Sequence, residues 1–271
     1  MSGRRSVGAN GGSNGRASAS PPAVARGHAS ALPLSYGLYL ESGPKRRKTM
    51  VHVLDLLGCV AVGPTTDDAL SATPGAIRAF RRFLHRHGET IDPDEPFETH
   101  LVEHVTEGEW LGNGSPYIAF GPDLEPASDE AIDGLVERFR WLSGELAAWA
   151  ATRTGTELDR KPDGPGRTER AILLHALGTT GPYLAAALGS APGFGHVSGA
   201  AEHGEMPLAE AFLEIAALAK DRVDRTTPEE RRAVLELPAG PRTLRKALRR
   251  MLEHDWEHLA ELSHRPGGPA L

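Results

Sequence analysis

The sequence has little cysteine, few aromatic residues and no long hydrophobic run. Its 271 residues include one cysteine, Cys59, and 6% aromatic side chains. A single cysteine excludes an internal disulfide framework and a cysteine-rich zinc finger, and it is typical of a reducing compartment. No stretch approaches the roughly 18 apolar residues that a membrane-spanning helix needs. We therefore expect a cytoplasmic protein with no membrane partner.

The chain also lacks the excess of positive charge that general nucleic-acid binding requires. Its net charge is −6, and residues 92–137 carry thirteen acidic side chains and no Lys or Arg. A stretch of one sign repels nucleic acid and anionic lipid. Nucleic acid is therefore not an expected partner.

Residues 1–31 contain almost no large apolar side chain. Gly, Ser, Ala and Arg dominate this stretch, which cannot bury enough surface to offset the entropy of ordering. We predict a disordered tail. Because the stretch is also rich in Ser and Arg and free of acid, an organelle transit peptide is the alternative.

Residues 32–120 have the pattern of a small α+β domain. Apolar residues alternate in two stretches, and two short apolar runs bounded by turn residues lie between them, all of which favour strands. Thr65 or Thr66 precedes two aspartates that suit the start of a helix. Pro74 should kink or restart that helix, and Gly88 should end it. The predicted order is β-β-β-α-β. The strands are expected near 36–40, 50–54, 59–62 and 97–105.

This order resembles the HicB-type antitoxin domain. The resemblance is carried by the strand pair 36–54, by Asp55-Leu56-Leu57-Gly58-Cys59, by Gly63, and by the helix start Thr65–Leu70. It implies the fold of that domain and no activity, because no toxin-contacting or DNA-binding part is visible.

Residues 128–265, after a short linker at 121–127, have the pattern of four amphipathic helices. Apolar residues recur at helical spacing in four stretches, separated by segments rich in Gly and Pro. We expect an all-α, up-down four-helix bundle in which Gly178 and Pro182 bend or split the second helix. The helices should begin near Ser128, Thr168, Pro207 and Pro241, with a Gly-rich loop at 189–204.

Three histidines of the predicted bundle form a candidate metal site. His254 and His258 are four residues apart, so they stack on one face of the last helix, on the side that carries its apolar residues. His175 belongs to the inward face of the second helix. Three neutral imidazoles from two helices can hold a divalent ion with one position open. The alternative is three buried or rim histidines without a metal.

The arrangement resembles the DinB/YfiT-like family of metal-binding four-helix bundles. The matching residues are His175 in Leu174-His175-Ala176, and the His254/His258 pair. The resemblance implies that these three residues are metal ligands, and the metal is Zn, Ni, Fe or Mn. Family members activate a low-molecular-weight thiol for addition to an electrophile. The whole chain also looks like a group of actinobacterial proteins of unassigned role.

Other polar residues have two readings each. Asp255 should face the core, where it either orients a histidine ligand or pairs with a basic residue of a neighbouring helix. Glu202 and His203 either overhang the site or are surface loop residues.

His100 and His104 lie too far apart along a strand to share a metal, and Cys59 is better explained as a buried residue than as a nucleophile. Trp256 should pack against the first bundle helix.

Two function classes follow. The first is a metal-dependent enzyme, a thiol-dependent transferase or a hydrolase that acts on a small electrophile. The catalytic residues are unknown, and a small-molecule substrate or a thiol would be the partner. The alternative is a non-catalytic stress-response or antitoxin-like protein-binding module, with a homodimer left open. Metal analysis of the purified protein separates the two.

Overall fold

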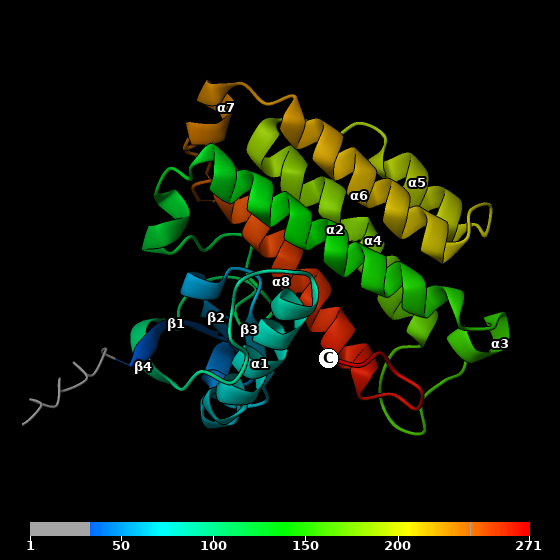
Figure 1. Cartoon of the computed structure of the whole chain (residues 1–271), viewed down its shortest axis with the longest axis horizontal. Coiled ribbons are helices and arrows are strands. Elements are labelled where there is room, and N and C mark those ends of the chain that lie inside the picture. The colour runs from blue at the N-terminus through cyan, green and yellow to red at the C-terminus, as the bar shows by residue number, and fades with distance from the viewer. Residues whose placement is uncertain (1–32, 239) are drawn as a thin grey trace, which may run out of the picture. The chain divides into compact units, whose positions relative to one another are not determined.

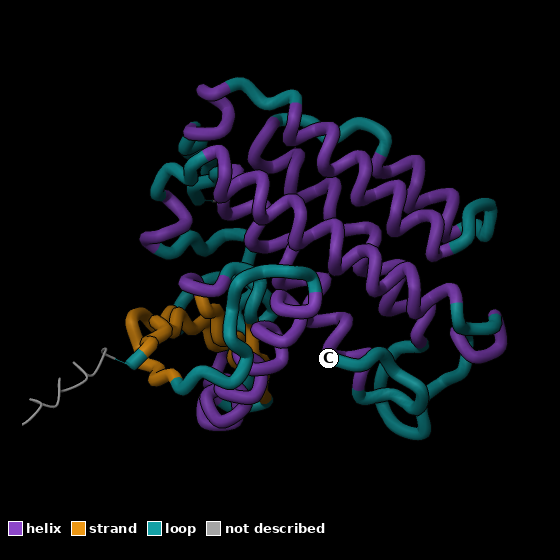
Figure 2. Tube along the Cα trace, viewed as in Figure 1, coloured by secondary structure: helices purple, strands orange, loops and turns teal. Residues whose placement is uncertain are grey.

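A mixed four-stranded sheet forms the first part of the chain, and helices form most of the rest (Figures 1 and 2). The structure is a computed structural model that describes residues 33–238 and 240–271. Within Pro33–Leu271 the sheet and the helices belong to one compact unit. The tail predicted at residues 1–31 lies outside the described residues, and the domain division at 121–127 stays a prediction.

The sheet contains β1 (Leu34–Ser42), β2 (Thr49–Val53), β3 (Val60–Gly63) and β4 (Phe97–Val105), in the order β3-β2-β1-β4. β1 pairs antiparallel with β2, and β2 pairs antiparallel with β3. β4 returns to pair parallel with β1, so it lies at one edge of the sheet. The four predicted strands and the β-β-β-α-β order are confirmed. Single turns of 3-10 helix, η1 (Pro44–Arg46) and η2 (Leu54–Leu56), follow β1 and β2.

Helix α1 (Thr66–Arg86) connects β3 to β4 and packs on the sheet. The Thr65 hydroxyl caps it by accepting a hydrogen bond from the Asp68 amide, as the sequence predicts. The restart expected at Pro74 is wrong, since α1 runs through it. Thr73 and Ile77, on either side of the proline, are buried. Their packing outweighs the local loss of one backbone hydrogen bond.

Four long helices follow, and each packs against two of the others (Figure 1). α2 and α4 each contact α6 and α8. Ser128 and Thr168 cap α2 and α4, and Pro207 precedes α6, as predicted. The long helices are α2 (Asp129–Ala151), α4 (Glu169–Leu188), α6 (Leu208–Asp224) and α8 (Leu244–Ser263). The short elements between them are η3 (Gly121–Leu124), α3 (Gly155–Leu158), α5 (Phe194–Glu202) and α7 (Pro228–Arg232).

Of the bend or split expected at Gly178 and Pro182, the split is not found, since α4 is one continuous helix. Two other local predictions for the helical part are wrong. The segment expected to be a Gly-rich loop contains α5, which packs Phe194 against Gly181 of α4, where only a hydrogen atom leaves room for the ring. The last helix begins at Leu244 rather than at Pro241, because the Thr243 side chain caps it.

Helix α4 is long and apolar enough to cross a membrane by length and composition alone. The core helix of a soluble protein passes the same test, and 44% of the apolar stretch of α4 is buried against the other helices. The cytoplasmic location stays a prediction.

A buried network of charges joins helix α8 to strand β2 and to η3. Arg249 donates two 2.7 Å hydrogen bonds to the carboxylate of Asp123, and both side chains are 1% exposed. Arg249 and Arg250 also donate to Glu253, and Glu253 meets the His52 imidazole of β2 at 3.0 Å. Burial by itself raises the pKa of Glu253. The charges of Arg249 and His52 lower this pKa by a larger amount, so it lies below its ordinary value. Asp123, expected within the linker, is therefore an anchor for α8.

We predict that Asp123→Asn destabilises the fold by about 3–5 kcal/mol, because it leaves the Arg249 guanidinium buried with only part of its countercharge. Urea denaturation measures the change in the free energy of unfolding. The matched control is Asp221→Asn, which breaks an exposed pair with Arg225 and should cost at most about 1 kcal/mol. Equal effects of the two substitutions would contradict the role of Asp123.

Candidate metal centre

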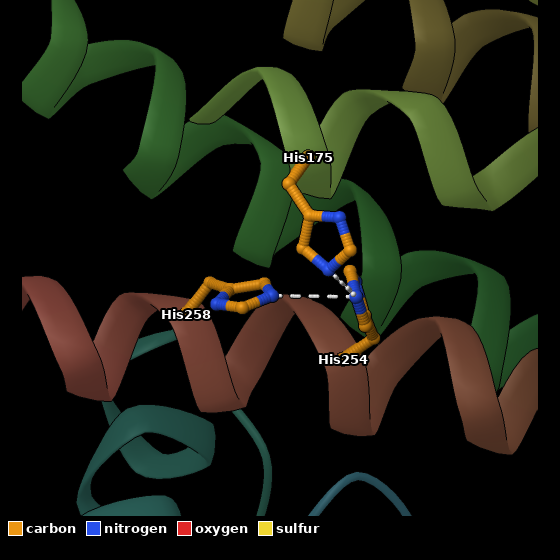
Figure 3. Close-up of side chains that lie close together, drawn as sticks. All are labelled: His175, His254 and His258. Carbon is orange, nitrogen blue, oxygen red and sulfur yellow. Dashed lines mark hydrogen bonds between the residues drawn. The ribbon is translucent and has the colours of Figure 1, made fainter. Parts of the chain in front are cut away.

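Helices α4 and α8 bring His175, His254 and His258 together (Figure 3). The Nε2 atom of His254 lies 3.2 Å from Nε2 of His175 and 3.3 Å from Nε2 of His258. One nitrogen from each ring lies within 4.8 Å of the other two. The three side chains predicted from spacing therefore form one cluster, and we call it the His cluster.

The hydrogen bonds around His254 determine which of its nitrogens carries the proton. The Thr179 hydroxyl donates its hydrogen to the Ala176 carbonyl, 2.9 Å away. The same oxygen lies 3.0 Å from Nδ1 of His254, and with its hydrogen already used it can only accept. Nδ1 of His254 therefore carries the proton, and Nε2 presents a bare lone pair to the His cluster.

His258 is oriented in the same way by a carboxylate. Its Nδ1 lies 3.0 Å from Oε2 of Glu261, which also accepts a 2.7 Å hydrogen bond from Arg167. Although partial burial raises the pKa of Glu261, the hydrogen bond from His258 and the charge of Arg167 lower it overall, so Glu261 is ionised and can only accept. The contact of Nδ1 with Glu261, at 3.0 Å, is shorter than its contact with the Arg167 guanidinium, at 3.5 Å. Nδ1 of His258 therefore donates to the carboxylate, and its Nε2 also presents a lone pair.

The surroundings favour the neutral form of two members of the cluster, His175 and His254. Burial, with the positive charge of neighbouring groups, lowers the pKa of His254 well below its ordinary value. Burial and His258 also lower the pKa of His175. His254 and His258 are 6% and 4% exposed, whereas His175 is exposed. The His cluster is therefore closed on the side of α8 and accessible on the side of α4.

This geometry fits a metal ion. Two lone pairs that face each other at 3.3 Å repel, since neither nitrogen has a hydrogen to donate to the other. A shared cation removes that repulsion. In a tetrahedral site with metal–nitrogen bonds of about 2.0–2.1 Å, neighbouring ligand nitrogens are about 3.3 Å apart. The two separations that involve His254, 3.2 and 3.3 Å, agree with this value, and the nitrogens of His175 and His258 lie within 4.8 Å of each other.

Asp255 lies next to the cluster without bonding to it. It is 2% exposed, and burial raises its pKa well above the ordinary value. Its Oδ1 is 3.9 Å from Nδ1 of His254, too far for a hydrogen bond, and Nδ1 already donates to Thr179. An ion pair between Asp255 and a basic residue of a neighbouring helix is not found among the described residues either, so neither of the two roles predicted for Asp255 is observed.

The other candidates lie away from the cluster. Glu202 and His203, at the end of α5, are exposed, and His203 bonds to the Gly199 carbonyl. His100 bonds to Ser35 on β1. Cys59 is fully buried, and burial raises the pKa of its thiol, so the buried reading is confirmed.

Trp256 packs on an element that the sequence did not indicate. Its ring contacts Phe80 and Phe83 of α1, with centroids 4.9 and 5.5 Å apart. The sheet and α1 cover that side of α8, which sequence periodicity alone does not reveal.

Three residues that orient the cluster were missed from the sequence. Thr179 lies four residues after His175, on the same face of α4, although the histidine that it orients is His254 of α8. Glu261 lies three residues after His258, on the same face of α8. Arg167 precedes α4 in a loop, and no spacing rule identifies it. Comparisons with models of known protein families, with curated proteins and with solved structures give no match to this chain.

The lowered pKa of His254 predicts that acid destabilises the metal-free protein. Below its ordinary pKa of 6.5 this imidazole takes up a proton in the unfolded chain but stays neutral in the folded one. Acid then favours the unfolded chain, by up to about 1.4 kcal/mol per pH unit for one such group. Denaturation with chelator present, at several pH values from 7 to 5, measures this slope.

The slope should be shallower in His254→Gln, which has no titrating group at this position. Identical slopes for this variant and the wild type would show that His254 titrates normally in the folded protein.

Proposed function

We propose that His175, His254 and His258 hold one divalent metal ion with a coordination position open toward the exposed side of His175. The observation that carries the proposal is the pair of unprotonated Nε2 atoms facing each other in the buried part of the cluster. Three imidazoles suit Zn, Ni, Fe or Mn, and the chain favours none of them.

We further propose that α2, α4, α6 and α8 form an up-down four-helix bundle of the DinB/YfiT-like kind. Two observations support the bundle. The four helices pack against one another, and the cluster histidines come one from the second long helix and two from the fourth. The β-β-β-α-β order of the first part supports a HicB-like fold in the same way, and it supports no activity.

The chemistry that fits this site best is that of a thiol-dependent transferase or a hydrolase acting on a small electrophile. A divalent ion in such a site lowers the pKa of a bound thiol or water so that a nucleophile is available near neutral pH. The chain's own residues orient the site, since Thr179 and Glu261 accept from the Nδ1 atoms and keep both Nε2 atoms available.

A cavity of about 570 Å³ adjoins the residues that orient His258. Arg167 and Glu261 line it, together with Trp256 and the small side chains of one face of α1. A Cβ atom added at Gly75 would meet no heavy atom within 4 Å, so this wall is open. The cavity gives room for a small molecule beside the site, which supports a small-molecule substrate.

We predict that protein purified without a histidine tag contains about one divalent ion per chain, measured by mass spectrometry of the elements. The double substitution His254→Ala/His258→Ala should abolish it. The control is His100→Ala/His104→Ala, the other pair at the same spacing, which should retain the metal because β4 lies apart from the cluster. A wild-type protein without metal, even after incubation with each of the four ions, overturns the proposal.

Thr179→Val should weaken metal binding about 10–100-fold, because His254 loses the acceptor that fixes its tautomer. Competition with a chromophoric chelator measures the affinity. Thr179→Ser keeps the hydroxyl and should bind as tightly as the wild type. A Val variant of unchanged affinity would refute the orienting role of Thr179.

The same preparation distinguishes the enzyme from the non-catalytic alternative. A metal-loaded protein that consumes a low-molecular-weight thiol in the presence of an electrophile, with loss of activity in His254→Ala/His258→Ala, favours the transferase. Metal-dependent release of acid from an ester, without thiol, favours the hydrolase. A loaded protein with neither activity favours the binding module.

A further inference from the structure

Strand β4 is an edge strand whose side chains are largely exposed. It follows β1 in the strand order and ends the sheet, away from β3 (Figure 1). From Glu98 to Glu103 every residue is exposed, and Leu101 and Val102 are 57% and 48% exposed. One edge of its backbone pairs with β1. The other edge has no strand partner among the described residues and is a template for a further strand.

The first half of β4 is regular enough to pair. Phe97–Leu101 runs in unbroken register with Leu34–Leu38 of β1, and the irregularity in the ladder comes after Leu101. Bulges discourage edge pairing, so the region available to a new strand is Phe97–Leu101. We call these five residues the β4 edge.

The β4 edge is complementary to itself. In an antiparallel pair around a two-fold axis at Thr99, Phe97 faces Leu101 of the second copy, and Glu98 faces His100. Apolar residues therefore meet each other, and acid meets imidazole. The Nδ1 atom of His100 contacts the Ser35 hydroxyl, which leaves Nε2 directed elsewhere and available.

Neighbouring registers lack this complementarity. Side chains that face each other across an antiparallel pair must point to the same face, so the two-fold axis passes through a single residue. An axis at Glu98 sets two carboxylates against each other. An axis at His100 sets Glu98 against Val102, beyond the regular part of the strand. Only the axis at Thr99 pairs every residue of the β4 edge with a compatible one.

We propose that the β4 edge is a self-association surface, and that two chains pair antiparallel through Phe97–Leu101 to join their sheets into one. The occupant is a second copy of this chain because the register that fits is the symmetric one. Five residues a side make a small interface, so the dimer forms in a concentration-dependent way. The His cluster lies on α4 and α8, so each chain keeps its own cluster.

Sedimentation of the full chain over a range of concentrations tests the surface. We expect a reversible monomer–dimer equilibrium, weakened at least about tenfold by Leu101→Lys. The control is Leu213→Lys on α6. Leu213 is 56% exposed, so this variant makes the same leucine-to-lysine change on an exposed surface away from β4. A wild-type chain that is monomeric throughout, or equal effects of the two lysines, overturns the proposal.

A second pair of variants tests the register. The substitution His100→Glu places a new carboxylate opposite the Glu98 carboxylate of the other copy, at two symmetric positions, and should weaken the dimer about tenfold. Adding Glu98→Lys places an ammonium group opposite the new carboxylate and should restore the dimer. Restoration cannot follow from a folding defect. A double variant that stays as weak as His100→Glu contradicts the axis at Thr99.

Discussion

Fifteen of the twenty residues of α8 are buried, and this constraint organises the rest of the described chain. A helix that is enclosed on nearly all sides can carry charged residues only if each finds a partner, since an unpaired buried charge costs several kcal/mol. Arg249 and Arg250 form ion pairs with Glu253, Arg249 also pairs with Asp123 of η3, and Glu253 contacts His52 of β2. The position of α8 relative to the sheet is determined by these pairings.

The same helix carries two of the three cluster histidines one turn further along. Because the network and the surrounding apolar side chains hold α8 in place, His254 and His258 are presented to α4 at a constant depth. The cluster thus has a rigid, buried half on α8 and an exposed third member on α4. The cation that we propose for this cluster would therefore be held by a buried pair of ligands and reached from the exposed side of His175.

The proposed metal centre and the proposed β4 edge depend on different parts of the structure. The His cluster rests on helix packing and on the tautomers fixed by Thr179 and Glu261. The β4 edge rests on an exposed strand that neither α1 nor α8 covers along Glu98–Glu103. An experiment that overturns one of the two proposals therefore does not overturn the other. The variants of the cluster histidines and of Thr179 leave the β4 edge unchanged, and the variants that test the β4 edge leave the His cluster unchanged.

Local sequence patterns determined the positions of the secondary structure and the identity of the cluster. Alternation and short apolar runs located the four strands, and the caps Thr65, Ser128 and Thr168 located helix starts. The four-residue spacing of His254 and His258 selected one helix face. These are properties of neighbouring residues, so one sequence contains them. The four-helix bundle and both family resemblances remain predictions.

Only the tertiary structure decided which distant residues meet. The parallel return of β4 beside β1, the pairing of Asp123 with Arg249, and the packing of Trp256 on α1 each join segments far apart in the chain. The proton positions on His254 and His258 depend in the same way on Thr179 of another helix and on an ionised Glu261 held by Arg167. Spacing cannot show these contacts, because they depend on how the elements pack rather than on the period within one element.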